Sequence, residues 1–470
     1  MKSFVDYQPE QSLLLPPSLE DWLPEDHLAR FIAEVSLELD LSEVFASYQR
    51  DGRGQSAYHP LMMVRLLLYG YCVGVVSSRG MERKTYEDVA FRYLACNQHP
   101  DHTTLAEFRR RHRQSLEHLF VNVLALCREA GLVKLGHVSL DGTKMKANAS
   151  IHATQRYRSL VAGEEMLVRQ VKEILAEAER VDAAEDERHG RNRHGDELPE
   201  GFRSKQRRLE KVREAKARLE QQARQRAEPE EKKTGGRSRP KPAEETGAES
   251  KAAPGEAPVS AEQKINLTDA DSRLMRDRTS LGWVQGYNVQ AAVDRQAQII
   301  VAAEVTQDQN DRKHLCPLVE QVQQNLGRRP EKVSADTDYW SPIQVSQPIL
   351  EGVDLYIRPD EPPKAVRDAE RRDATGAPAR KKKPRSGYAN EGLSRADALR
   401  MKLSTPEGRA IYAQRREIIE PVFWQIKQRR GFRQFLFRGL EQVRSEWKLI
   451  CLTHNLLKLY RNSWLSARAA

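Results

Sequence analysis

The sequence has few cysteines and no long uninterrupted apolar run. Its five cysteines are scattered and never spaced as Cys-x-x-Cys. This excludes a disulfide framework and a cysteine zinc site, and it favours a reducing compartment. The longest apolar stretch, LMMVRLLLYGYCVGVV at residues 61–76, contains Arg65 and is too short to span a bilayer. The N-terminal segment MKSFVDYQPEQ lacks the apolar run of a signal peptide. We therefore expect a cytoplasmic protein with no membrane partner.

The chain carries more basic than acidic residues. Its 470 residues exceed the usual size of a single core, so we expect two or three structural units. Lys and Arg number 77 against 67 Asp and Glu, which gives a formal net charge of +10. Such a balance favours a polyanionic partner, nucleic acid first.

Residues 1–132 are predicted to form a helical N-terminal domain that binds DNA. Apolar residues recur there at helical spacing, and Thr104 with Glu107 has the pattern of a capping box that opens a helix ending at Gly131. The segment RRRHR at residues 109–113 gives this helix a basic face. That face either is solvated or contacts a DNA backbone.

Strand patterns begin at residue 137 and predict an α/β core with a mixed sheet. HVSLDGTKMKA alternates apolar and polar residues, and two later strands are joined by a short polar turn as a hairpin. A helix and two further strands follow, an order that suits an α/β architecture. The expected parts are a first strand in 133–151, the other strands and a helix in 263–360, and C-terminal helices in 401–470.

Two segments interrupt this core. Residues 152–227 contain two amphipathic helices that we interpret as a helical hairpin or short coiled coil. Residues 228–262 are rich in Pro, Gly, Glu and Lys, which predicts a disordered linker. Residues 361–400 form a basic loop region that either binds DNA or is solvated.

Three carboxylates occupy positions that are unusual for surface acids. Asp141 and Asp336 each end an apolar strand, and Glu420 lies on a C-terminal helix among apolar residues. Each has an ordinary alternative, since Asp-Gly at 141–142 is a common turn pair. Together they can converge at one sheet edge, where like charges require compensation by divalent cations with oxygen ligands. Two such ions ~3.5–4 Å apart support phosphodiester chemistry.

The helix around Glu420 also carries bases. At ~100° per residue, five side chains share one face: Tyr412, Arg416, Glu420, Phe423 and Lys427. This arrangement suits a helix that lies against DNA, with Glu420 at the metal and the bases on phosphates. The alternative is a plain intrahelical pair between Arg416 and Glu420. Pro421 predicts that the helix starts or bends nearby.

Several blocks resemble the DDE transposases of bacterial insertion sequences, in the branch whose last catalytic acid lies in a Tyr-Arg-Glu-Lys signature. The matching blocks are SLDGTKMKANAS, NLTDADSRLM, VQGYNVQAAVD, SADTDYWS and the segment that starts YAQRREIIEPVFWQIK. The N-terminal blocks SAYHPLMMVRLLLYGYCVGVVSSRGMER and DHTTLAEFRRRH resemble the helical domain of the same branch. The resemblance covers roughly residues 15–465.

The resemblance implies a ribonuclease H-like catalytic core with Asp141, Asp336 and Glu420 as catalytic residues and metal ligands. The implied cofactor is Mg²⁺, as two ions for which Mn²⁺ can substitute. The implied activity is cleavage of double-stranded DNA at element ends and strand transfer into target DNA, by a nucleoid-associated homo-oligomer assembled on DNA. The alternative is a non-catalytic, transposase-derived DNA-binding protein or self-repressor.

The signature residues imply DNA contacts by Tyr412, Arg415, Arg416 and Lys427, although two positions depart from the family pattern. Tyr412 lies one residue further from the glutamate than in the signature, while Arg415 keeps the tyrosine-to-arginine spacing but points off the shared face. Asp338 stands where the family usually has glycine. It is therefore a rival of Asp336 for the second acid.

Overall fold

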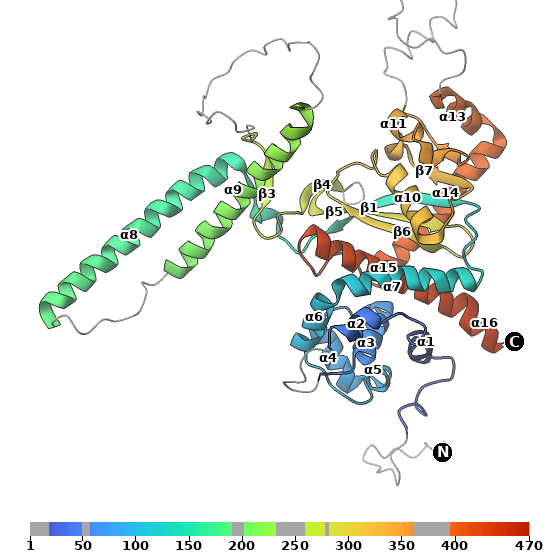
Figure 1. Cartoon of the computed structure of the whole chain (residues 1–470), viewed down its shortest axis with the longest axis horizontal. Coiled ribbons are helices and arrows are strands. Elements are labelled where there is room, and N and C mark those ends of the chain that lie inside the picture. The colour runs from blue at the N-terminus through green and yellow to red at the C-terminus, as the bar shows by residue number, and fades with distance from the viewer. Residues whose placement is uncertain are drawn as a thin grey trace, which may run out of the picture. The chain divides into compact units, whose positions relative to one another are not determined.

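The computed structural model describes residues 18–48, 57–189, 202–231, 259–277, 282–360 and 395–469. The chain forms two compact units. Unit 1 comprises residues 1–143, 288–436 and 441–470, and unit 2 comprises residues 144–287 and 437–440. The division falls within two strands, β1 (Val138–Lys146) and β5 (Gly282–Asp294), which pass from one unit into the other (Figure 1).

The N-terminal part of unit 1 is helical, as its apolar spacing predicts. Its helices are α1 (Leu28–Val35), α2 (Ser42–Ala46), α3 (Pro60–Val73), α4 (Ser78–Glu87), α5 (Val89–Leu94), α6 (His102–Arg111) and α7 (Arg113–Glu129). Helix α3 is buried along most of its length. No single helix in the described ranges is long and apolar enough to cross a membrane, although α3 and α4 meet that measure as a pair bent by 98°.

The helix expected from Thr104 to Gly131 is two helices, and its cap differs from the prediction. Asp101 caps α6, because its Oδ1 accepts hydrogen bonds from the backbone N–H groups of Thr103 at 2.8 Å and Thr104 at 3.0 Å. The prediction of a Thr104–Glu107 capping box was wrong, since an acid three residues earlier already satisfies these donors.

The basic face predicted at residues 109–113 is smaller than expected. Arg109 is buried and donates to the Tyr71 hydroxyl and the Val76 carbonyl. His112 is also buried, at the break between α6 and α7. Two of the five basic side chains therefore stabilise the helical domain from within.

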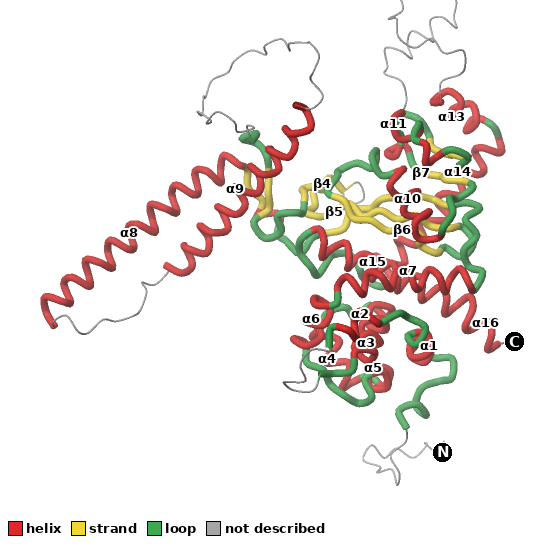
Figure 2. Tube along the Cα trace, in the orientation of Figure 1, coloured by secondary structure: helices red, strands yellow, loops and turns green. Residues whose placement is uncertain are grey.

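A mixed six-stranded sheet forms the core, as predicted. Its order is β4-β5-β1-β7-β8, with β6 paired to β5. The β1–β7 and β7–β8 pairs are parallel, whereas β5 pairs antiparallel with β4 and β6 (Figure 2). The remaining strands are β4 (Arg273–Asp277), β6 (Ile299–Thr306), β7 (Lys332–Ala335) and β8 (Asp354–Ile357).

Helices cover the part of this sheet that belongs to unit 1. Helix α10 (Leu315–Leu326) and helix α7 pack on β6, and α14 (Pro406–Trp424) packs on β7 and β8. In α15 (Leu440–Leu459), the buried Trp447 donates its indole N–H to the Gln290 carbonyl at 3.1 Å. The other elements are η2 (Thr337–Tyr339), α11 (Pro342–Val345), η3 (Pro348–Leu350), α13 (Arg395–Ser404), the π-helical turn η4 (Gln425–Arg429), η5 (Tyr460–Trp464) and α16 (Leu465–Ala469).

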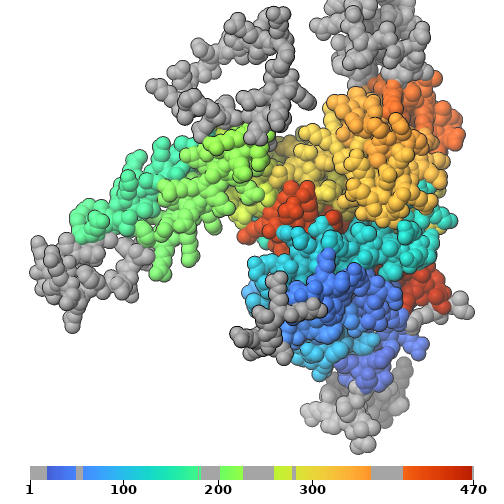
Figure 3. Space-filling view, in the orientation of Figure 1, coloured from blue at the N-terminus to red at the C-terminus, as the bar shows by residue number. Residues whose placement is uncertain are grey.

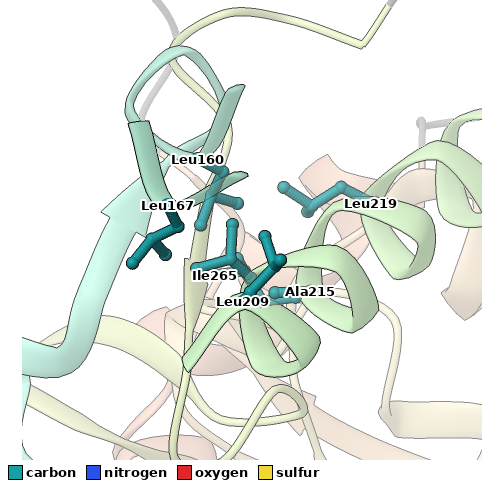
Figure 4. Close-up of a cluster of buried hydrophobic side chains, with 7 residues drawn as sticks. Leu160, Leu167, Leu209, Ala215, Leu219 and Ile265 are labelled. Atoms are coloured by element: carbon teal, nitrogen blue, oxygen red, sulfur yellow. The ribbon is translucent and has the colours of Figure 1, made fainter. Parts of the chain in front are cut away.

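Unit 2 contains the predicted helical hairpin. Helices α8 (Tyr157–His189) and α9 (Phe202–Glu231) lie along each other (Figure 3). At their base, η1 (Ile151–Ala153) leads into β2 (Thr154–Arg156), which pairs antiparallel with β3 (Lys264–Asn266). A cluster of buried side chains joins them (Figure 4): Leu160, Leu167, Leu209, Val212, Ala215, Leu219 and Ile265.

Two predicted boundaries change. Helix α9 continues to Glu231, four residues into the segment expected to be a linker. The apolar spacing that predicted this helix ends before the helix itself does. Residues 395–400 of the expected basic loop begin α13. Residues 259–262 of the expected linker are described, and Glu262 forms ion pairs with Arg156 and Arg158. The other parts of both predicted loops, at 232–258 and 361–394, lie outside the described residues.

Candidate active site

Parallel pairing of β1 and β7 brings two of the predicted acids together. Leu140 is the register partner of Ala335, so Asp141 and Asp336 each follow a directly paired residue. Asp336 comes immediately after β7, as expected. Asp141, however, does not end its strand, because β1 continues to Lys146. The prediction of a turn alternative at Asp-Gly is therefore wrong for this position.

Burial and neighbouring acids raise the cost of ionising both carboxyl groups. Burial, followed by the charge of Asp336, raises the pKa of Asp141 to about 7. Burial and the charge of Asp338 raise the pKa of Asp336. Asp336 also caps η2, since its Oδ1 accepts from the Asp338 N–H at 3.0 Å. Such a perturbed pair in a sheet is typical of functional sites.

Arg415 supplies the positive charge nearest to this pair. Its Nη1 lies 3.9 Å from Asp141 Oδ2, and its side chain is only 13% exposed. The guanidinium lowers the pKa of both Asp141 and Asp336 against the larger effect of burial. The ring centroid of Tyr412 lies 5.8 Å from Arg415 Cζ. Arg415 was expected to point away from the helix face that carries Glu420. It is instead the side chain of α14 that lies against Asp141.

A third buried carboxylate, which the pattern did not predict, lies beside the pair. Asp311 is 6% exposed and accepts hydrogen bonds from Asn288 and Gln290 of β5. Its charge raises the pKa of Asp141 and Asp336. The signal in the sequence is the pair of amides, Asn288 and Gln290, that interrupts the apolar run YNVQAAV. Asp311 itself lies in the loop before α10, which starts at Leu315.

The predicted face of α14 is divided in the structure. Arg416 and Glu420 are exposed and form an ion pair, with Arg416 Nε 3.8 Å from Glu420 Oε1. Phe423 packs inward and is buried. The prediction that all five side chains look in one direction was therefore wrong. The exposed pair stabilises the helix by only about 0.3–0.5 kcal/mol.

Pro421 does not start α14, the first of the two outcomes predicted for it. The helix begins at Pro406 and runs through Pro421 to Trp424. It then widens into the π-helical turn η4, a feature that often occurs at functional sites. Within η4, Lys427 donates a hydrogen bond to the Thr143 hydroxyl, two residues after Asp141.

The donors present fit a divalent cation in part. Asp141 and Asp336 offer adjacent carboxylate oxygens whose mutual repulsion a hard cation relieves. Nevertheless, no group of three or more His, Cys, Asp or Glu side chains in the described ranges has the arrangement of a metal site. In the described residues, Glu420 does not form a metal-ligand cluster with Asp141 and Asp336.

Two regions of the chain match known protein families. Residues 17–111 match a transposase domain (DUF772), and residues 262–456 match the transposase DDE domain. Both matched families are transposase domains, and the second is of the DDE type. The transposase DDE match includes Asp336 and Glu420, while Asp141 lies between the two matched regions. No curated protein and no solved structure gave a match.

Proposed function

We propose that this chain cleaves DNA at the ends of an insertion sequence and joins those ends to target DNA. The observation that carries the proposal is the parallel pairing of β1 with β7, which puts Asp141 and Asp336 side by side in a partly buried setting. In the proposal, the mixed sheet is a ribonuclease H-like core and Glu420 is the third acid. Double-stranded DNA is the substrate of an oligomer that acts at the nucleoid.

In the proposal, the acidic and the basic side chains have separate roles. Asp141 and Asp336 would hold Mg²⁺, or Mn²⁺ in its place, and the bound cations would activate the attacking oxygen and stabilise the leaving one. Arg416, which is exposed, and Lys427, on exchanging its hydrogen bond to Thr143, would bind the flanking phosphates. Tyr412 would orient Arg415 through the ring contact and so limit the repulsion between the aspartates.

Glu420 is suited to join the aspartates only when substrate and cation are present. It is 59% exposed, and its ion pair with Arg416 is weak enough to be exchanged for a phosphate contact at little cost.

A second candidate function is DNA binding without catalysis, as in a self-repressor. It is favoured by one observation: the described residues do not gather three acids as metal ligands. Phosphate binding needs the bases of α14 but not the acids, so the two functions predict different results for the same variants.

Cleavage of labelled element ends with Mg²⁺ separates the two. Wild type is compared with Asp141→Ala, Asp336→Asn, Asp338→Gly and Glu420→Gln. Glu417→Gln is the matched control, because Glu417 is an exposed acid one turn earlier on the same helix. We expect loss of cleavage by at least about 100-fold for each triad variant and none for the control.

Three outcomes would change the assignment. Normal cleavage by Glu420→Gln removes Glu420 from the site. An inactive Asp338→Gly beside an active Asp336→Asn makes Asp338 the second acid. Binding of ends without cleavage by the wild type itself favours the repressor.

A further inference from the structure

A buried polar network lies next to the aspartate pair within unit 1. Asp311 Oδ1 accepts hydrogen bonds from Asn288 Nδ2 and from Gln290 Nε2, each at 2.6 Å. Gln290 Oε1 in turn accepts from the Tyr339 hydroxyl. All four side chains are buried, and Asn288, Gln290 and Tyr339 have no exposed surface. The side chains of the network are therefore shielded from solvent.

The network touches both strands that carry the acids. Tyr339 is the last residue of η2, the turn that Asp336 caps, so its hydrogen bond to Gln290 holds the β7 end. On the other side, Gly142 follows Asp141. A Cβ at Gly142 would lie 2.4 Å from Gln290 Nε2 and 2.9 Å from Asp311 Oδ1. The φ angle of Gly142 is not positive, so this glycine is needed for space rather than for a turn.

The arrangement is costly for a purely structural core. Asn288 Oδ1 is buried and has no hydrogen-bond partner, and it lies 3.1 Å from where a Gly142 Cβ would be. An unpaired buried acceptor and a third buried carboxylate both destabilise the fold. Asp311 moreover adds negative charge to a place where Asp141 and Asp336 already repel each other. A divalent cation bound by the two aspartates would offset this added negative charge.

We propose that Asp311 is a positioning residue of the aspartate pair. By accepting both β5 amides, it holds Gln290 against Tyr339 and Gly142, and so it fixes the backbone on which Asp141 and Asp336 present their carboxylates to a divalent cation. This inference rests on the proposed function, since the cation is the one that the DNA-cleavage site would hold. Nearby hydrogen-bonding groups that orient ligands commonly change metal affinity by about 10–100-fold when removed.

Mn²⁺ binding to the full-length protein, measured by calorimetry without DNA, tests the inference separately from cleavage. Asp311→Ala removes the acceptor, whereas Asp311→Asn keeps an oxygen that can accept both amides. Gln290→Met breaks the network at its centre with little change in volume. Asp308→Ala is the matched control, because it removes an exposed carboxylate three residues earlier in the same loop. Thermal unfolding in EDTA reports whether each variant folds.

We expect Asp311→Ala and Gln290→Met to bind Mn²⁺ at least about 10-fold more weakly, and Asp311→Asn to stay within about threefold of wild type. Wild-type affinity in Asp311→Ala or in Gln290→Met would overturn the inference. So would an Asp311→Asn variant as weak as Asp311→Ala, because charge rather than hydrogen bonding would then matter. If Asp311→Ala does not fold, the other two variants decide by the same criteria. Failure of the wild type to bind Mn²⁺ would overturn the proposed function, and this inference with it.

Discussion

Replacement of Asp141 by asparagine should stabilise the metal-free protein while it abolishes cleavage. Asparagine keeps the size of the side chain and the oxygen that accepts from the Gly142 N–H at 2.9 Å. It removes a carboxylate that burial and the Asp336 charge make costly to ionise. A residue kept in spite of such a cost is better explained by function than by folding.

The size of the effect follows from the pKa of Asp141, which rises from 3.8 to about 7 in the folded protein. The folded state holds this proton more tightly than the unfolded chain, so the penalty is absent below 3.8 and grows as the pH rises toward 7. At about 1.36 kcal/mol per pKa unit, the full penalty is about 4 kcal/mol. The carboxyl is 21% exposed, and solvent screening reduces the expected gain to about 2–4 kcal/mol near pH 8.

Urea unfolding in EDTA measures this gain as a function of pH. The advantage of Asp141→Asn over wild type should shrink from about 2–4 kcal/mol near pH 8 to about 1.5 kcal/mol or less near pH 5. Mg²⁺ should stabilise wild type and have a smaller effect on the variant. Asp397→Asn, at an exposed site, is the control and should change little. The reasoning fails if Asp141→Asn gains no stability near pH 8, or if its gain is independent of pH.

Two further predictions concern the packing of unit 2. Gly286→Ala should destabilise it by at least about 2 kcal/mol, because the new Cβ would lie 2.2 Å from the Met145 carbonyl oxygen. Gly163→Ala in α8 has open space and should stabilise by up to about 1 kcal/mol, so equal effects at the two glycines in urea unfolding would contradict the close approach. Leu219→Ala should cost about 2–5 kcal/mol, since Leu219 is 1% exposed in the hairpin cluster. The same change at Leu175, which is 40% exposed, should cost under about 1 kcal/mol, and a comparable loss there would refute the assigned core.

Local patterns predicted most elements of the fold. Alternation identified β1, and runs of apolar residues identified the β5–β6 hairpin and β7, because strands that face the core on one or both sides carry apolar residues at alternate or successive positions. Errors occurred at ends and breaks. The cap at Asp101 and the break at His112 depend on a few local hydrogen bonds and on packing, which spacing does not encode.

The site was predictable in part. Asp141 and Asp336 stood out as polar residues after apolar strands, and the structure pairs their strands. Arg415 was expected to point away from the acids, because the helical periodicity was counted from Glu420 and places Arg415 on another face. In α14 the buried side instead includes Ile418, Ile419 and Val422, and this orientation turns Arg415 inward. Which side of a helix meets the sheet depends on the whole apolar surface and not on the residues of interest.

The sequence by itself determined the order of helices and strands, the two-helix insertion and the residue types that could bind metal and phosphate. These follow from periodicity and composition, which act between near neighbours in the chain. Only the tertiary structure decided that Asp311 lies against Gly142, because residues 169 positions apart meet through the pairing of strands and the approach of a loop. It also decided that Asp141 carries a raised pKa, since burial and the charge of Asp336 exist only after β1 and β7 have paired.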